Sequence, residues 1–449
     1  MAIPHVDGGT LGLEWGLPFV GTLLSIALVP LLAPTFWHHH FGKVSAFWAA
    51  SFLIPLTAAF GDRVALYEVL HVLLLEYVPF ILLLFALFVV AGGIRVVGNL
   101  IGTPETNTAV LAFGTMIASL LGTTGAAMLL IRPLIQANEN RRYKLHVFTF
   151  FIFLVANIGG ALTPLGDPPL FLGFLQGVKF SWTLQSMLAP MLVCSGILLT
   201  LFYVIDRRAW RREDGRRTQR LPWRIQLQGS HNLLLLAGVV GAVLLSGLWK
   251  PDADLTVFHL SIPLQGIVRD LILVLLAWLS WSTTPATIRI ENAFTWRPLQ
   301  EVAMLFAGIF VTIIPALAIL QAGPSGALAD LVTVVNAPGG QPNNIVYFWL
   351  TGLMSSFLDN APTYLIFFNV TGAKPEALME TLSGTLLAIS AGAVFFGAMT
   401  YVGNAPNFMV KSICEERGVR MPGFFGYMAW SCAILLPLFA LLTVVFFSD

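Results

Sequence analysis

Charged residues are scarce in this chain of 449 residues: they make up 10%, where an ordinary soluble domain has roughly 25%. The 24 basic and 23 acidic side chains are too few to cover the surfaces of two or three soluble domains. Because 57% of the residues are hydrophobic, the composition indicates a protein embedded in lipid. The net charge of +1 leaves no large surface for polyanions, so we expect a lipid bilayer and no nucleic acid among the partners.

Cysteine is equally rare, and Cys194, Cys414 and Cys432 form no CxxC pair. This excludes a disulfide framework and a thiolate metal site, and we expect no cofactor. There is no HExxH motif, and the glycine-rich segments do not follow a strand, so we expect neither an enzyme nor a nucleotide-binding protein. The segment Met1–Glu14 lacks the basic start and the small-residue cleavage site of a signal peptide, so we expect the first apolar run to be retained.

Apolar runs of membrane-crossing length dominate the sequence, since a helix needs about 20 apolar residues to span the hydrocarbon core. Ten such runs lie near residues 15–34, 45–61, 67–94, 145–177, 182–205, 232–249, 268–287, 301–321, 383–412 and 425–447. Two further segments, about 107–136 and 343–372, have polar centres with glycine or proline, which is typical of re-entrant hairpins. We therefore predict an all-α polytopic membrane protein with about ten transmembrane crossings plus two re-entrant hairpins.

Basic residues orient this layout, because short cytoplasmic loops are rich in lysine and arginine. With the N-terminus outside, the inside loops hold 18 of the 24 basic residues, and eight of them fall within Arg207–Arg224. The outside loops hold only Arg63, Lys179, Lys250, Arg269 and Lys374. We expect a bacterial-type inner (plasma) membrane, with the Arg207–Arg224 loop in the cytoplasm and both chain ends outside.

The polar linker Asp206–Gly229 divides the chain near its middle, with five crossings on each side. Five is an odd number, so the second half enters the membrane upside down relative to the first. This predicts two inverted repeats, residues 1–225 and 226–449.

A sequence match supports the repeat. Residues 160–171 and 397–408 share the pattern GA[LM]TxxG[DN]xPxF at a shift of 237 residues, and the same shift places residues 119–125 on 356–362. Glycine and proline interrupt the hydrogen bonding of a membrane helix and expose backbone groups that bind ions. We therefore predict interrupted helices at about 145–177 and 383–412, with breaks at Gly166, Pro168, Pro169, Gly403 and Pro406.

Three acidic residues, Glu76, Asp167 and Asp359, lie deep within apolar segments, where a carboxylate is costly and usually marks function. We expect Glu76 to pair with a nearby polar group such as His71. In the inverted arrangement the hairpin tips and the helix breaks converge. They predict one oxygen-lined site for a cation or proton, with Asp359 and Asp167 as sodium ligands, made of Thr123, Thr124, Thr163, Asp167, Asp359, Asn360, Thr400 and Asn404.

Arg132 lies in one arm of the first hairpin, away from its tip. Its side chain either extends to the cytoplasmic surface or holds a substrate anion.

The segments Asn157–Asp167 and Leu358–Pro362 resemble those of the ion transporter superfamily, and most closely NhaD-type sodium/proton antiporters and their citrate-transporter relatives. The resemblance covers nearly the whole chain. It implies a scaffold part, which often forms a homodimer, and a mobile transport part with the hairpins and broken helices. The implied function is a secondary active transporter that exchanges sodium for protons by alternating access. The alternative is a sodium-coupled transporter of citrate, a dicarboxylate or another anion.

The hairpin tips favour the first function. The dicarboxylate branch of the superfamily carries Ser-Asn-Thr at its tips, whereas this chain has Gly122-Thr123-Thr124 and Asp359-Asn360-Ala361. A carboxylate at the second tip would repel citrate unless it is protonated or masked by bound cations. A cation is therefore the simpler cargo.

Overall fold

The computed structural model describes residues 6–98, 100–213, 225–251, 253–335 and 341–448. Within these ranges nine helices are long and apolar enough to cross a membrane: Leu13–Leu32, Pro34–Phe60, Asp62–Gly92, Leu145–Leu162, Phe180–Arg211, His231–Leu248, Leu264–Thr283, Arg297–Gln321 and Phe424–Phe446. The one predicted crossing without a counterpart among these nine, 383–412, is divided between two shorter helices, Ser383–Phe396 and Ala405–Glu416. The chain is an all-α polytopic membrane protein, as its composition predicts.

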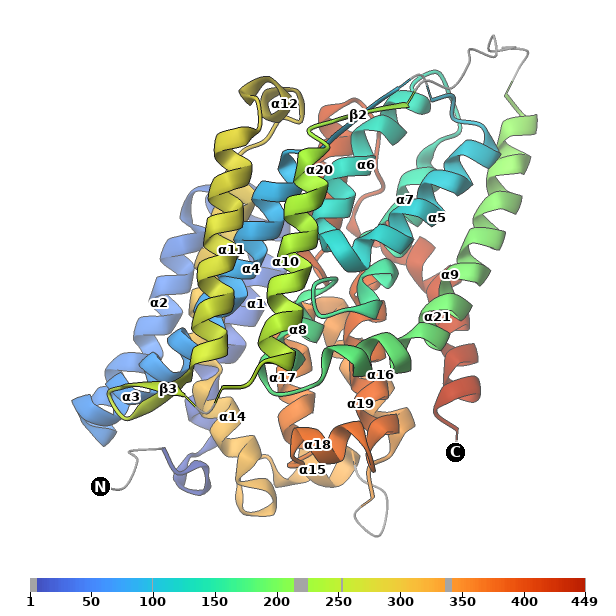
Figure 1. Cartoon of the computed structure of the whole chain (residues 1–449). Helices are drawn as coiled ribbons and strands as arrows, with labels where there is room; N and C mark the ends of the chain where they lie inside the picture. The colour runs from blue at the N-terminus through green and yellow to red at the C-terminus, as the bar shows by residue number, and fades with distance from the viewer. Residues whose placement is uncertain (1–5, 99, 214–224, 252, 336–340, 449) are drawn as a thin grey trace.

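One group of helices lies beside the two predicted hairpins, residues 107–136 and 343–372 (Figure 1). Its members are α1 (Leu17–Leu32), α2 (Pro34–Phe60), α3 (Asp62–Val72), the π-helical turn η3 (Leu73–Tyr77), α4 (Val78–Gly92), α10 (His231–Leu248), α11 (Leu264–Thr283), α12 (Ala286–Glu291), α13 (Arg297–Thr312), α14 (Ile314–Gln321) and α15 (Ala329–Val335). Helix α4 packs against α10 and α11, and α13 packs against α2.

The second group contains the predicted hairpins and broken helices. Its members are α5 (Pro104–Leu121), α6 (Thr123–Ala137), α7 (Leu145–Leu154), η4 (Ile158–Leu162), α8 (Pro168–Leu175), α9 (Phe180–Arg211), α16 (Asn344–Phe357), α17 (Asn360–Val370), α18 (Pro375–Met379), α19 (Ser383–Phe396), η6 (Gly397–Met399), α20 (Ala405–Glu416) and α21 (Phe424–Phe446). The core of this group is dense: every residue of α7 after Leu145 is buried. Such all-round burial fits a helix that is apolar on every face.

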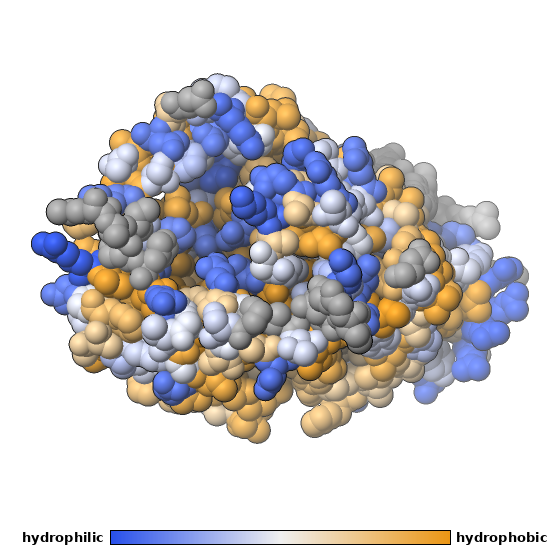
Figure 2. Space-filling model, turned by 90° about the horizontal axis from the view of Figure 1, so that it is seen from below, coloured by the Kyte–Doolittle hydropathy of each residue, from blue (hydrophilic) through white to orange (hydrophobic). Residues whose placement is uncertain are grey.

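Two short antiparallel strand pairs complete the fold, with β1 (Arg95–Gly98) on β2 (Ile225–Gln228) and β3 (Asp254–Val257) on β4 (Leu260–Pro263). Short 3-10 turns occur at Gly8–Thr10, Leu13–Gly16 and Gly323–Ser325. Figure 1 shows α12, β2 and the C-terminal end of α9 at one end of the helix bundle, which we call the basic end. Helices α14, α15 and α18 and the C-terminal end of α21 lie at the opposite end. Seen from that opposite end, hydrophilic residues gather on the face, and apolar residues predominate along the lower edge of the view (Figure 2).

The loop predicted between the first two crossings, which carries Lys43, is instead the first part of α2. Helix α2 begins at Pro34, directly after Ala33 ends α1. Proline at the first helical position needs no hydrogen-bond partner for its nitrogen, so it starts a helix well. Part of the predicted cytoplasmic loop, residues 214–224, lies outside the described residues.

Of the described basic residues assigned to inside loops, two are buried. Arg141 forms an ion pair with Asp206, and the Nη1 group of Arg289 donates to the carbonyl of Val89 at 2.8 Å. Burial lowers the pKa of Arg289 to about 10. These two side chains therefore help to hold the helices together at the basic end. Because they are buried, they are weaker evidence than exposed arginines for which side of the membrane this end faces.

The arrangement predicts where reporters should be found. Because the C-terminal end of α21 and the C-terminal end of α9 lie at opposite ends (Figure 1), a reporter fused after Asp449 should be periplasmic and one inserted in the Arg207–Arg224 loop cytoplasmic. Phosphatase and fluorescent-protein fusions at both positions measure this. Reporters on the same side would show that the two halves do not each cross the membrane five times.

Candidate functional site

Four helices begin at one place in the interior: α6 at Thr123, α8 at Pro168, α17 at Asn360 and α20 at Ala405. Sequence explains two of these starts. Prolines stand in the first turn of α8 and α20, where a missing N–H costs nothing. The residues directly before the four helices are Gly122, Asp167, Asp359 and Asn404. The N-terminal end of a helix carries partial positive charge, so this convergence stabilises carboxylates.

Asp167 is the centre of the site and is 1% exposed. Its side chain does not cap its own helix but faces three donors. Oδ1 accepts from the Thr123 hydroxyl at 3.1 Å and from Asn404 Nδ2 at 3.0 Å, and Oδ2 accepts from Asn360 Nδ2. All three donors are electrically neutral. The carboxylate thus has hydrogen bonds on both oxygens but no positively charged partner among the described residues.

These donors correspond to each other in the two halves of the sequence. Thr123 and Asn360 are 237 residues apart, and so are Asp167 and Asn404. The two hairpin tips therefore hold the same carboxylate, and the residue that matches Asp167 in the second half is itself a donor to it. The hairpin tips and the helix breaks, which the sequence analysis predicts to converge, are therefore in contact.

The predicted residues Thr163 and Thr400 connect each hairpin to its broken helix. The Thr163 hydroxyl donates to the carbonyl of Ser119, at the end of α5, and the Thr400 hydroxyl donates to the carbonyl of Ser356, at the end of α16. Both pairs are 44 residues apart. Each threonine thus satisfies one carbonyl that the end of its hairpin helix would leave without a partner.

Asp359 and Thr124 lie at the edge of this cluster. Asp359 is partly buried, and its carboxylate accepts from the backbone N–H of Ala361 at 3.1 Å. It is close enough to Asp167 for the two charges to interact. Thr124 makes no side-chain hydrogen bond within the described ranges, so of the eight predicted residues it is the one least connected to the others.

Two asparagines that the sequence analysis missed extend the site. Asn404 Nδ2 also donates to Asn157 Oδ1 at 3.2 Å, and Asn157 Nδ2 donates to Asn407 Oδ1 at 2.7 Å. Asn407 in turn donates to the carbonyls of Gly397 and Thr400. Neither asparagine has an asparagine at the matching position of the other half, so the repeat gave no signal for them. Together they fix the orientation of the Asn404 amide.

The Asn360 amide has one unused group. Its Nδ2 donates to Asp167, but its Oδ1 is buried and accepts no hydrogen bond from the described residues. A buried oxygen without a donor costs about 1–3 kcal/mol. Such an oxygen next to a carboxylate is a suitable ligand for a small hard cation.

No group of three or more histidine, cysteine, aspartate or glutamate side chains that could hold a metal ion is found in the part of the chain that the structure describes. The oxygens available to a cation at this site are those of Asp167, Asp359, Asn360 and the Thr123 hydroxyl. This set suits an alkali cation as cargo better than a transition metal.

The expectation that Glu76, Asp167 and Asp359 are the three deep acidic residues is wrong, because Glu68 and Asp206 are buried as well, whereas Asp359 is only partly buried. Asp206, read from the sequence as the start of the linker, lies in α9 and accepts from Arg141, from Asn107 Nδ2 at 2.9 Å and from His146 Nε2 at 2.8 Å. These partners come from α5, the α6–α7 connection and α7. The cluster ties those elements together at the basic end.

Glu76 does not join the cation site. It lies in the π-helical turn η3, where its Oε1 accepts from Gln176 Nε2 at 3.2 Å, at the end of α8. Its Oε2 has no partner among the described residues. Its hydrogen-bond partner is thus Gln176, which directly follows α8, and not the His71 that the sequence analysis expected.

Comparison with known proteins identifies the family. Residues 8–447 match the model of a family described as "Putative citrate transport". The chain belongs to this family. The "Putative citrate transport" match covers both hairpins, both helix breaks and Asp167 and Asp359 alike. A similar protein, the "Uncharacterized transporter slr0753" of Synechocystis sp. (strain ATCC 27184 / PCC 6803 / Kazusa), is 28% identical over 359 residues, which are 75% of this chain and 74% of that protein. Family membership makes this chain a membrane transporter.

Proposed function

We propose that the protein is a secondary active transporter that exchanges sodium for protons at Asp167 and Asp359. One observation carries the proposal: a buried carboxylate, Asp167, is surrounded by neutral donors, and an unpartnered oxygen of Asn360 lies beside it. A buried negative charge is costly without a compensating positive charge. Either a proton or a sodium ion supplies that charge, and one site cannot hold both.

The Asn360 amide offers a way to make the two states exclusive. When Asp167 is ionised, Asn360 donates its N–H to the carboxylate and presents its oxygen to sodium. When Asp167 is protonated, its O–H becomes a donor, and rotation of the amide turns the oxygen towards it. The N–H group then faces the cation position and disfavours sodium there. Proton binding and sodium release are thereby coupled through one side chain.

The proposal includes two inverted repeats, residues 1–225 and 226–449, with α5–α6 and α16–α17 as re-entrant hairpins. The bonds from Thr163 to Ser119 and from Thr400 to Ser356 support it, because corresponding residues make the same contact in both halves. Movement of the second helix group against the first would expose the site alternately to the two sides. We place the protein in a bacterial inner membrane, with the first group as the scaffold of a homodimer.

Transport in liposomes tests this function. A sodium pulse outside vesicles that contain the protein should change the internal pH, as read by a trapped dye. Asp359→Asn removes an exchangeable charge but keeps the side-chain shape, so sodium-driven proton movement should fall to the level of empty vesicles. Thr124→Ala is the control, because Thr124 is the third residue of the other tip, where the second tip has Ala361, and it forms no side-chain hydrogen bond among the described residues. Exchange in Asp359→Asn equal to that of the wild type would exclude Asp359 as a carrier.

A second function, sodium-coupled transport of citrate or another carboxylate, is favoured by the family description and by the convergence of four helix N-termini. In that case Thr123, Asn360 and Asn404 would contact the anion and the aspartates the coupling sodium. Calorimetric titration with citrate or succinate, with and without sodium, separates the two functions. Heat that appears only when sodium is present indicates coupled anion transport.

A further inference from the structure

A cavity of about 370 Å³ opens at the basic end, between α6, the end of α20, β1 and α12. This volume lies within the range of small-molecule sites, about 300–1,000 Å³. Arg132 lies nine residues after the start of α6, which is about 13 Å along the helix from Thr123 at 1.5 Å per residue. Arg132 therefore lies well towards the basic end from the cluster around Asp167.

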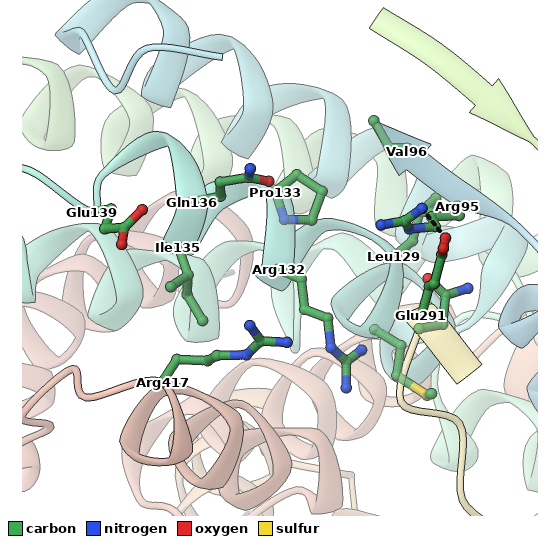
Figure 3. Close-up of a pocket in the computed structure, with 12 residues that line it drawn as sticks. Arg95, Val96, Leu129, Arg132, Pro133, Ile135, Gln136, Glu139, Glu291 and Arg417 are labelled. Carbon is green, nitrogen blue, oxygen red and sulfur yellow. Dashed lines mark hydrogen bonds and ion pairs between the residues drawn. The ribbon is translucent and has the colours of Figure 1, made fainter. Parts of the chain in front are cut away.

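Two arginines in the cavity lack acidic partners. Figure 3 shows the side chains of Arg132 and Arg417 converging on the space between α6 and the end of α20. Arg132 Nη1 is buried without a hydrogen-bond partner, and neither arginine forms an ion pair within the described ranges. The two like charges are close enough to repel each other. An anion between them would satisfy the buried Nη1 group of Arg132 and offset that repulsion.

The acidic residues nearby do not cancel this charge. Three arginines and two glutamates line the cavity. Glu291 is already paired with Arg95, and the exposed Glu139 is the other acid in the lining. Glu416, beside Arg417, attracts Arg132 but makes no hydrogen bond to it in the described part of the chain. One guanidinium therefore remains in excess over the carboxylates of the cavity lining.

The remaining wall indicates an organic anion. Met128, Leu129 and Pro133 form an apolar surface, while Gln136 and Asn292 offer amide groups. An inorganic ion would use the guanidinium groups and leave the apolar wall in contact with water. We propose that Arg132 and Arg417 bind a small di- or tricarboxylate anion at the basic end. This goes beyond the proposed cation exchange, which needs no anion.

Calorimetric titration of the purified full-length protein with citrate, succinate and inorganic phosphate tests the site. Arg132→Gln and Arg417→Gln should each weaken citrate binding about 10- to 100-fold, the loss expected for one charge-assisted contact. Arg132→Lys should give an intermediate loss, since lysine keeps the charge but not the planar fork. Arg420→Gln is the matched control, because Arg420 is exposed three residues after Arg417 and does not line the cavity. It should bind citrate as the wild type does.

Several results would overturn the inference. Unchanged citrate affinity in Arg417→Gln, whose side chain lies on an exposed residue and is not needed for folding, would exclude the site. Phosphate binding as tight as citrate binding, with the same response to the variants, would exclude the polycarboxylate assignment. Asp167→Asn should lose sodium-driven proton exchange but keep citrate binding in sodium-free buffer. Failure of the proposed cation exchange and failure of the proposed anion site therefore give different results.

Discussion

Asp167→Asn is expected to abolish sodium-driven proton movement and to weaken sodium binding about 10- to 100-fold, in line with the loss of one charged ligand. The substitution keeps the size of the side chain but replaces an acceptor by a donor where Asn360 Nδ2 points. Rotation of the Asn360 amide relieves this conflict, because its oxygen is without a partner. The variant should therefore fold, and sodium binding measured against pH should lose its dependence on this proton.

Asn404→Ala is the comparison for this experiment. It removes one neutral donor from Asp167 and leaves both carboxylates in place. Sodium affinity should fall only about 2- to 10-fold, as expected for a neutral hydrogen bond, and its pH dependence should remain. If Asp167→Asn left the pH profile unchanged and Asn404→Ala shifted it, Asp167 would merely begin helix α8, and Asp359 would be the sole carrier.

Gly166→Ala is expected to lower the stability of the protein by about 1–3 kcal/mol, as overpacking of a tight interior does, and to stop transport. A Cβ atom on Gly166 would lie 2.1 Å from the carbonyl oxygen of Gly160, so the backbone of the first break would have to open. The carbonyl of Gly166 also accepts from the N–H of Thr123 at 2.8 Å, which would be disturbed with it. The unfolding temperature in detergent and the exchange rate in liposomes measure both effects.

Gly196→Ala serves as the control for the same chemical change. Gly196 lies inside α9, and a Cβ atom there would meet nothing within 4 Å. Alanine in a helix is favoured over glycine by about 0.5–1 kcal/mol, so this variant should be slightly more stable and fully active. A Gly166→Ala protein with the unfolding temperature of Gly196→Ala would contradict the close backbone contact.

The sequence was sufficient to predict the membrane fold and the contact between tips and breaks. Apolar runs of about 20 residues are a strong signal, since lipid admits few other structures. The match of Gly160–Phe171 with Gly397–Phe408 made the second break as visible as the first. Thr123, Asn360, Asp167 and Asn404 could be brought together because each has a counterpart 237 residues away.

Residues without counterparts were harder to predict. Asn157 and Asn407 are single amides in apolar surroundings, and they contact each other across 250 residues. Asp206 seemed from its neighbours to begin a polar linker, whereas Arg141 and His146, which bury it, are 65 and 60 residues earlier. In both cases the decisive partner is distant in sequence, and local composition carries no information about it.

The two aspartates come from positions that do not correspond. Asp167 precedes the broken helix of the first half, where the second half has Asn404, and Asp359 stands at the tip of the second hairpin, where the first half has Gly122. Two copies of the first half would place two acids at the breaks, and two copies of the second half would place two acids at the tips. Neither half expressed alone can therefore rebuild the combination of one acid at a break and one at a tip by forming a dimer with its own copy.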